Sequence, residues 1–411
     1  MVLTSQGGLS ALRRIHPVRI VLALLLALAG AVATTGSGGG DALAGARYTS
    51  EKSKVARGLY LIRKYDNKLD ARIKVLRVDP STSMTLDVSL SNDKLPQREK
   101  TTAMAARHNA IAAINASVGN SWGRPIGVFA EDGSLKTSPM VTGGAFSYAH
   151  NESEGHIGYP GFKVRAYPLE GNGPALWVND WNDPIPHPDK ISGYTPAGGD
   201  VVKTPENSCS ARLKKLGKVR WARGNTGVSR TYRVTTVRCR QRRMPLKGGI
   251  VLAAPRGSTG ATKLQDGPNR DDKLNLTWSV GWTGALDVVG GSPVLLLDKK
   301  IIAEPCGGYV CKKHPRSGVG VTESGIVLLV TVDGRQADSK GMTILQFARL
   351  FKKLGAQKAL NLDGGGSSTM VVKGEVVNSP SGGGERSVAS ALLVLNHADG
   401  AEPDPVQPLA P

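Results

Sequence analysis

Alternating apolar and polar residues mark the first strands of the chain. The stretches at 57–66 and 71–79 alternate in the way that half-buried strands do. Apolar-rich segments predict further strands at 110–114, 326–332, 356–362 and 389–395. The segment 288–297 predicts a Gly-Gly turn that leads into a buried strand. A hairpin is predicted where 368–372 and 376–377 flank Lys373-Gly374-Glu375.

Helical periodicity is clearest over 341–354. The apolar face predicted there consists of Ile344, Phe347, Phe351 and Leu354. Thr343 stands where an N-cap residue is expected, and Gly355 where a helix ends in the left-handed conformation. A second short helix is predicted over 101–108. Hairpins combined with at least one helix crossover predict an α+β fold with a mixed β-sheet core and a few helices.

The N-terminus has the features of an export signal. Positive residues precede the ten-residue apolar run at 20–29, and small residues at 31–33 offer a cleavage site. The run is short for a membrane span, although an uncleaved anchor is the alternative. We therefore expect a signal peptide at 1–33 and a secreted protein without a transmembrane domain. The Gly-rich stretch 34–46 is typical of a flexible linker, and the Pro-rich tail 397–411 of disorder.

The composition excludes a chain that is disordered throughout, and it gives the protein a strong positive charge. Hydrophobic residues make up 40% of the 411 residues, and 53 Lys and Arg against 33 Asp and Glu give a net charge of +20. The segment 207–265 contains no acidic residue, and most of its basic residues lie in 207–247. Such a segment attracts an anionic polymer, for example a phosphate-containing wall glycan. The alternative is a solvated hairpin that only maintains solubility.

Four cysteines suit an oxidising compartment. We predict the pairs Cys209–Cys239 and Cys306–Cys311, because each pair brackets one local loop, although the sequence allows three connectivities. A zinc site is the competing interpretation. It is weakly supported, because the chain has no close CxxC pair and its seven histidines are scattered.

The densest chemical signal is the run Asn361-Leu362-Asp363-Gly364-Gly365-Gly366-Ser367-Ser368-Thr369. A predicted strand delivers an amide and a carboxylate, and three glycines follow. Glycine allows a substrate to approach the backbone closely, and exposed N–H groups in such a loop can hold an anion. By itself the run is also compatible with a plain turn.

Other segments carry matching chemistry. His314-Pro315-Arg316, Asp333-Gly334-Arg335 and Gly383-Gly384-Glu385-Arg386 each place a guanidinium next to small or acidic residues, and Asn115 ends a buried strand. Arginine is the preferred bidentate partner of phosphate. Any one of these segments is more often a surface ion pair than a catalyst, but together they indicate a site suited to a sugar phosphate.

From His314 to Val394 the pieces HPR, DGRQ, NLDGGGSST, NSPS and GGER follow one another in order. This run resembles the C-terminal signature of the phosphodiester glycosidase family, which includes N-acetylglucosamine-1-phosphodiester α-N-acetylglucosaminidase and many exported bacterial proteins. Weaker similarity extends upstream through VLRVDP at 75–80, AAIN at 112–115, GYTPAGGD at 193–200 and VVGGSPVLL at 288–296. The resemblance implies a single catalytic domain at 47–396 with long loop insertions, the basic segment 207–247 among them.

The resemblance also implies hydrolysis of a sugar C1–O bond with a phosphodiester as the leaving group. We assign Asp363 as nucleophile or base, and Glu385 or Asp333 as a second carboxylate, whose separation from the first would set the stereochemistry. The residues expected to bind phosphate or sugar, or to orient a carboxylate, are Asn115, Arg316, Arg335, Asn361, Gly364, Gly365, Ser367, Ser368 and Arg386.

The expected substrate is a glycosyl phosphodiester or a related cell-wall or exopolysaccharide glycan. The alternative is a non-catalytic binder of anionic wall polymer. A metal phosphodiesterase is disfavoured because the histidines lack metal-ligand spacing. A serine nucleophile at Ser367 or Ser368 is disfavoured because no GxSxG motif is present. No cofactor is implied. A structural calcium ion held by loop aspartates is an alternative that the sequence leaves open.

Overall fold

The computed structural model describes most of the chain between residues 50 and 397. The residues left undescribed within that range are 142, 150–153, 171–172, 184–186, 222–225, 304–307 and 309–311. The chain divides into two units, Met1–Ala46 and Arg47–Pro411, and the described residues all belong to the second. None of the helices described here is long and apolar enough to cross a membrane. The predicted signal peptide and linker lie outside the described residues, as does the tail beyond His397.

The largest sheet has eight strands. In spatial order they are β1 (Ser50–Ala56), β2 (Leu59–Asp66), β3 (Ala71–Val78), β21 (Val327–Val332), β20 (Arg316–Thr322), β22 (Ala356–Asn361), β18 (Val294–Leu297) and β19 (Lys300–Ile301). The central strands β20 and β21 are buried along nearly their whole length. Their apolar runs are thus typical of strands covered on both faces.

Two five-stranded sheets follow. The first is β7 (Ser134–Thr137), β6 (Phe129–Glu131), β17 (Asp287–Gly291), β8 (Gly144–Ala149) and β9 (Glu154–Gly158). The second is β24 (Glu375–Val376), β23 (Met370–Val372), β5 (Ala112–Asn115), β25 (Ser390–Asn396) and β4 (Met84–Leu90). A shared hydrophobic cluster connects all three sheets, with Phe129, Phe146 and Leu360 among its fully buried members.

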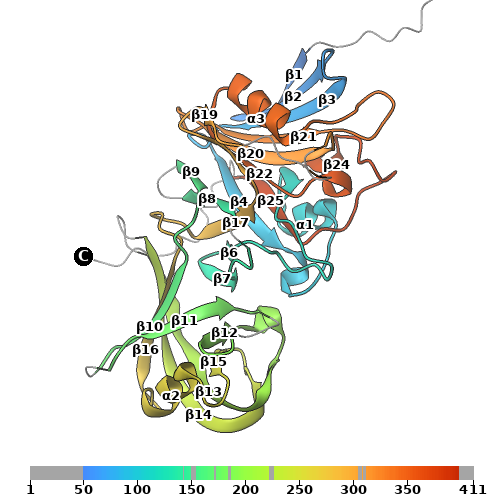
Figure 1. The fold of residues 1–411 in the computed structure, drawn as a ribbon. Helices are drawn as coiled ribbons and strands as arrows, with labels where there is room; N and C mark the ends of the chain where they lie inside the picture. The colour runs from blue at the N-terminus through green and yellow to red at the C-terminus, as the bar shows by residue number, and fades with distance from the viewer. Residues whose placement is uncertain are drawn as a thin grey trace, which may run out of the picture. The chain divides into compact units, whose positions relative to one another are not determined.

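The middle of the chain closes into a seven-stranded barrel (Figure 1). Its strands are β10 (Lys163–Pro168), β11 (Leu176–Trp181), β12 (Ile191–Tyr194), β15 (Ile250–Ala254), β13 (Val201–Trp221), β14 (Gly227–Pro245) and β16 (Lys273–Ser279). The basic segment 207–247 forms most of the long hairpin β13–β14. This segment is therefore part of a sheet, whereas the sequence had suggested an insertion whose course could not be traced.

Three α-helices occur among the described residues: α1 (Thr101–Arg107), α2 (Thr259–Asp266) and α3 (Ile344–Lys353). The predicted caps of α3 are confirmed. The Thr343 hydroxyl accepts a hydrogen bond from the Gln346 N–H at 3.2 Å, and Gly355 has φ +87°. The helix carries the chain from β21 over β20 to β22, so the predicted crossover is also confirmed.

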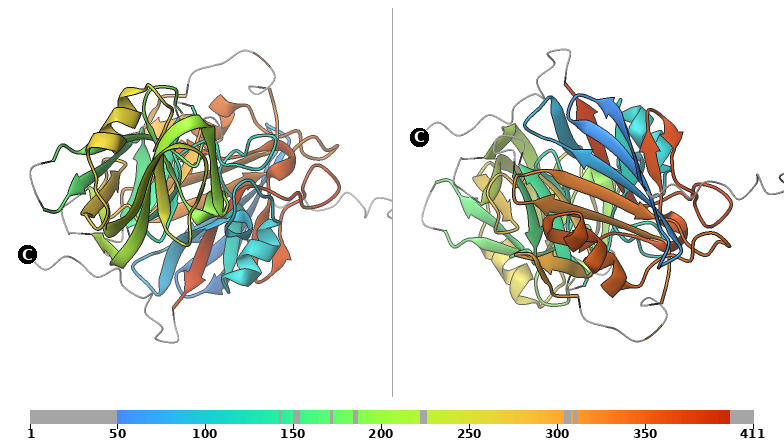
Figure 2. Two further views of the ribbon diagram at one scale, coloured as in Figure 1. Left: turned by 90° about the horizontal axis from the view of Figure 1, so that it is seen from below. Right: turned by 90° about the horizontal axis from the view of Figure 1, so that it is seen from above.

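Helix α3 covers one face of the eight-stranded sheet, as the right-hand view in Figure 2 shows. Glycines on β20 make the close approach possible. A Cβ at Gly318 would lie 2.8 Å from the Phe347 ring, and one at Gly320 would lie 2.7 Å from the Phe351 ring. Helix and sheet thus pack without a layer of β20 side chains between them.

The strand register brings distant motifs to one edge of this sheet. Arg316 pairs with Val332 across β20 and β21, and Gly318 pairs with Asn361 across β20 and β22. Because both pairings are antiparallel, the start of β20 meets the ends of β21 and β22. The segments that follow β21 and β22 therefore begin beside the motif that precedes β20.

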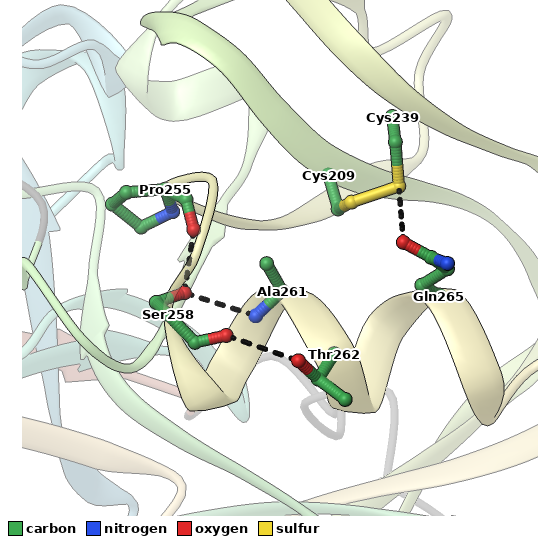
Figure 3. Close-up of a disulfide and its surroundings, with 7 residues drawn as sticks. All are labelled: Cys209, Cys239, Pro255, Ser258, Ala261, Thr262 and Gln265. Carbon is green, nitrogen blue, oxygen red and sulfur yellow. Dashed lines mark hydrogen bonds between the residues drawn. A yellow bond between two sulfur atoms is a disulfide. The ribbon is translucent and has the colours of Figure 1, made fainter.

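The disulfide Cys209–Cys239 is confirmed and links β13 to β14 (Figure 3). Helix α2 lies beside it, where the Cys239 sulfur is 3.8 Å from the Gln265 side-chain oxygen. The same helix is capped by Ser258, whose hydroxyl accepts from the Ala261 N–H at 3.0 Å. The second predicted disulfide, Cys306–Cys311, falls outside the described residues.

The predicted α+β class is confirmed only in part. The fold is mainly β, with three helices of 7, 8 and 10 residues among the described residues. The β11–β12 pair is parallel and the other described ladders are antiparallel, so the barrel is a mixed sheet. The prediction gave too little weight to strands because some strands of 163–279 pair with distant parts of the chain, as β10 does with β16, which local patterns do not reveal.

Candidate active site

The Gly-rich loop after β22 joins two sheets. It leaves the eight-stranded sheet at Asn361 and enters the second five-stranded sheet at Met370. Its backbone is fixed at three points: the Asp363 N–H donates to the Ala116 carbonyl at 2.8 Å, and the Gly365 N–H donates to the Pro315 carbonyl at 2.9 Å. The third point is the side chain of Asn115.

Asn115 is fully buried and holds both ends of the loop. Its amide nitrogen donates to the Asp363 carbonyl at 2.6 Å. Its amide oxygen accepts from the Thr369 N–H at 3.0 Å and from the Ser317 hydroxyl at 2.8 Å. All these contacts are within the protein, so the geometry makes Asn115 a positioning residue, which is one of its two predicted roles.

The half-buried Asp363 carboxylate lies within this loop. It accepts hydrogen bonds from the Ser367 hydroxyl and the Gly364 N–H, and the charges of Arg386 and Arg98 act on it. Burial outweighs these favourable contacts and raises the pKa of Asp363 to about 6. A carboxylate with such a pKa can accept a proton near neutral pH.

Two predicted arginines lie against the glycines. The Arg335 guanidinium occupies the space beside Gly365, where a Cβ would lie 3.1 Å from it, and the Arg386 guanidinium similarly occupies the space over Gly366. The Arg335 side chain is positioned by a hydrogen bond from its Nε to the His314 Nδ1, at 3.3 Å. The glycines therefore allow two cations to contact the loop backbone beside Asp363.

Arg316 differs from these two because its side chain is 3% exposed. Its Nε donates to the Met342 carbonyl at 2.9 Å, and one terminal nitrogen donates to the Lys312 carbonyl at 2.9 Å. Burial, together with the charge of Arg335, lowers its pKa to about 10. Arg316 thus ties the HPR segment to the start of α3 and contributes positive potential beneath the loop.

The two candidates for a second carboxylate have protein partners. Asp333 is 1% exposed, lies 3.6 Å from the Lys74 amine and accepts from the Asn378 side chain at 3.1 Å. Glu385 is half-buried and accepts from the N–H and hydroxyl of Thr102 at 2.8 and 2.6 Å, at the start of α1. No hydrogen bond or ion pair joins either carboxylate to Asp363 within the described part of the chain.

The remaining predicted residues line the base of the loop. The Asn361 amide donates to the Ser292 carbonyl at 2.7 Å and to the Leu362 carbonyl at 3.0 Å. Ser367 is buried and bonded to Asp363, whereas the buried Ser368 hydroxyl makes no hydrogen bond within the described residues. Of the predicted set, Asp363, Ser367 and Arg386 thus form one cluster.

Sequence reasoning missed Arg98. This exposed residue donates to the carbonyls of Asn120 and Ser121 at 2.9 and 3.0 Å, and its charge acts on Asp363. It precedes α1 in a stretch with no motif, so no local signal could have singled it out. Two clusters of possible metal ligands also occur: Asp93, His108 and Glu131, and Asp87, Asp132 and Asp287. Neither includes a predicted site residue.

The raised pKa of Asp363 predicts a pH dependence of stability. The folded state binds the proton more tightly than the unfolded chain, so the free energy of unfolding falls as pH rises from about 4 through about 6. Because Asp363 is partly exposed, we expect the free energy of unfolding to fall by only roughly 1–2 kcal/mol over this pH range. In Asp363→Asn this contribution to the pH dependence should be absent. Urea unfolding of both proteins at pH 4 and pH 7 measures it. Equal losses in both would contradict the assignment.

Comparison with known proteins agrees with this geometry. Residues 224–395 match the family model described as phosphodiester glycosidase, and they include the Asp363 loop, Arg335 and Arg386. This part of the chain is similar to the phosphodiester glycosidase family. The resemblance inferred from the motifs is thereby confirmed.

Curated relatives match short segments of this chain. The SPbeta prophage-derived uncharacterized protein YomE of Bacillus subtilis is 42% identical over 82 residues, which is 20% of this chain and 13% of that protein. The N-acetylglucosamine-1-phosphodiester alpha-N-acetylglucosaminidase of Bos taurus is 38% identical over 66 residues, 16% of this chain and 12% of that protein. The chain therefore matches only a small part of either protein.

The similarity in fold extends over more of the chain. A hypothetical protein from Synechocystis of known crystal structure superposes with a TM-score of 0.67 at 19% identity. The match covers 84% of this chain and 63% of that one. At this identity the likeness establishes a common fold and carries no statement on activity.

Proposed function

We propose that this chain is a secreted hydrolase that breaks the C1–O bond of a glycosyl phosphodiester. The observation that carries the proposal is the Asp363 carboxylate, held in a glycine loop with a pKa of about 6 and faced by Arg386 and Arg98. The similarity of residues 224–395 to the phosphodiester glycosidase family supports the reaction class. The name of the bovine relative supports an N-acetylglucosamine 1-phosphodiester as the first substrate to try.

In the proposed reaction, the cations act on the leaving group. Arg386 and Arg335 border the glycines, so a phosphodiester bound over the loop would receive both guanidinium groups and backbone N–H groups. As the C1–O bond breaks, the bridging oxygen leaves with the phosphate and its new charge is stabilised there. A phosphate is a stable leaving group, so little general-acid help is needed.

Asp363 supplies the other half of the reaction. At pH 7 it is mostly ionised, so it can take the proton of an attacking water or attack C1 itself. Either way, water supplies the oxygen that ends on C1, and the phosphate leaves as a monoester. The retaining and inverting courses differ in whether a glycosyl-Asp363 ester forms.

The setting of the reaction is part of the same proposal. The apolar leader at 1–33 supports export, and the net charge of +20 supports attraction to phosphate-bearing wall or exopolysaccharide glycans. These two features favour an anionic extracellular glycan as the natural substrate.

An isotope experiment tests which bond breaks. The methyl phosphodiester of α-N-acetylglucosamine 1-phosphate is incubated with the full secreted chain in ¹⁸O-labelled water, and the products are followed by phosphorus NMR. Cleavage of C1–O yields unlabelled methyl phosphate, which we expect. Cleavage of P–O places ¹⁸O in a phosphate product and would identify a phosphodiesterase instead.

Two further outcomes bear on the proposal. Other glycosyl phosphodiesters are tested in parallel, so that a narrow sugar preference is not mistaken for inactivity. Binding without turnover across the whole panel would overturn the hydrolase and favour a binder of anionic glycan.

A further inference from the structure

The basic hairpin β13–β14 turns two of its cations toward the inside of the barrel. Arg230 lies opposite Leu276 on β16, and Leu276 belongs to the barrel core. Lys215 lies opposite Tyr232, which is 6% exposed and belongs to the same core. Because opposite residues of an antiparallel pair share a face, both cations lie on the inner face of the barrel wall.

These two cations border a cavity of about 320 Å³ at the end of the barrel. Its walls include Trp181, Trp278 and Tyr232. Both indoles are held in place by the β6–β7 hairpin, since the Trp181 N–H donates to the Leu135 carbonyl at 2.8 Å and the Trp278 N–H donates to the Gly133 carbonyl at 2.9 Å. The cavity is thus preformed and has the size of a small-ligand site.

Most other charges around the cavity are already paired. Lys136 contacts Glu131 at 3.0 Å, and Lys94 lies 3.9 Å from Asp200. The one acidic residue of the lining, Asp93, contacts the Arg107 guanidinium at 3.0 Å.

Lys215 and Arg230, by contrast, have no carboxylate partner among the residues that the structure describes. Arg230 bonds to the Tyr232 hydroxyl, while its buried Nε makes no hydrogen bond within the same set. Burial, Arg230 and Lys136 together lower the pKa of Lys215. The inner wall of the cavity therefore carries positive charge that no described protein group neutralises.

We propose that this cavity binds a phosphorylated monosaccharide, with the phosphate on Lys215 and Arg230 and the sugar ring against the aromatic wall. A phosphomonoester carries nearly two negative charges at neutral pH, which matches two cations. Arg230 offers directed donors and Lys215 a mobile point charge. Trp278 and Tyr232, 3% and 6% exposed, contribute the atoms that border the cavity to its apolar lining, beside which one sugar can lie. The site involves none of the residues around Asp363, so it does not rest on the proposed hydrolysis.

Two exposed cations on the same two strands provide a matched control for the substitution of Lys215 and Arg230. Lys214 and Arg233 form the adjacent cross-strand pair, are exposed, and lie on the outer face of the barrel. Lys215→Met with Arg230→Met therefore removes two inner cations. Lys214→Met with Arg233→Met removes two outer ones from the same strands and changes the net charge equally.

Titration calorimetry with glucose 6-phosphate on the full chain tests the proposal, with glucose, inorganic phosphate and glucuronate as comparison ligands. We expect the inner double variant to weaken glucose 6-phosphate binding about ten- to hundred-fold, and the outer double variant to change it less than two-fold. Glucose 6-phosphate should also bind more tightly than each comparison ligand.

Three results would overturn the proposal: equal weakening by both double variants, no binding of glucose 6-phosphate to the wild type, or tighter binding of glucuronate. Should the inner double variant fold poorly, the exposed Lys215→Met alone is compared with Lys214→Met. Both single variants retain Arg230, whose buried Nε makes a substitution at that position the more disruptive one. Equal affinities in that pair would also refute the site.

Discussion

Replacing Asp363 by Asn is expected to lower kcat/KM for a glycosyl phosphodiester at least about a thousand-fold. The amide keeps the shape and one acceptor oxygen for the Ser367 and Gly364 donors, but it can neither attack C1 nor take a proton from water. Substrate affinity should be retained or rise slightly, because the arginines that bind phosphate stay in place. Initial rates and equilibrium binding on the same preparation give both quantities.

Asp298→Asn is the matched control for this experiment. Asp298 is an exposed residue in the turn between β18 and β19, so the same chemical change there should leave kcat/KM unaltered. A variant at Asp363 with more than a tenth of the wild-type rate would exclude this carboxylate as the reacting group.

Asn115→Ala is expected to lower the free energy of unfolding by about 3–5 kcal/mol. The change leaves three buried groups without their partner: the Asp363 carbonyl, the Thr369 N–H and the Ser317 hydroxyl. Because the loop loses the one side chain that bonds to both of its ends, activity should fall even at temperatures where the protein stays folded. Urea denaturation and initial rates at 10 °C measure the two effects.

Two other variants separate the contributions at this position. Asn115→Asp keeps the acceptor but loses the donor to Asp363, so it should be destabilised by an intermediate amount. Asn269→Ala, on an exposed loop residue, should change stability by less than about 0.5 kcal/mol. A loss below 1 kcal/mol for Asn115→Ala would show that the loop is held by other contacts.

Elements with strong local signals could be predicted from the sequence. Helix α3 has an apolar face, a capping residue and a terminal glycine within a short segment, and all three were found as expected. Strands β2 and β3 alternate cleanly, and β21 ends where the apolar run meets Asp333. In each case one short stretch contains everything that determines the structure.

The barrel could not be predicted in this way. Its strands pair across long separations, as β10 does with β16, so no window of sequence contains both partners. Strand β13 is also so rich in lysine that its alternation of inner and outer residues is obscured. Leu213 and Lys215 share the inner face because they are two residues apart, yet the first is buried in the core and the second is exposed.

The site was predictable in its location but not in the roles of its members. Motifs placed Asp363, Arg335 and Arg386 together because each lies directly beside a glycine-rich or strand-end segment. The burial of Asp333 and Arg316 depends on how the eight-stranded sheet meets α3 and Lys74, which is a tertiary property. Arg98 enters the site from a segment that carries no pattern at all.

The disulfide between β13 and β14 has a consequence beyond cross-linking. A shift of one residue between two strands exchanges their faces, and the β13–β14 ladder already contains several bulges. By fixing which residue of β13 lies opposite which residue of β14, the covalent link decides whether Lys215 and Arg230, or instead Lys214 and Arg233, face the interior. Oxidation of this cysteine pair is thus also what orients the electrostatics of the barrel.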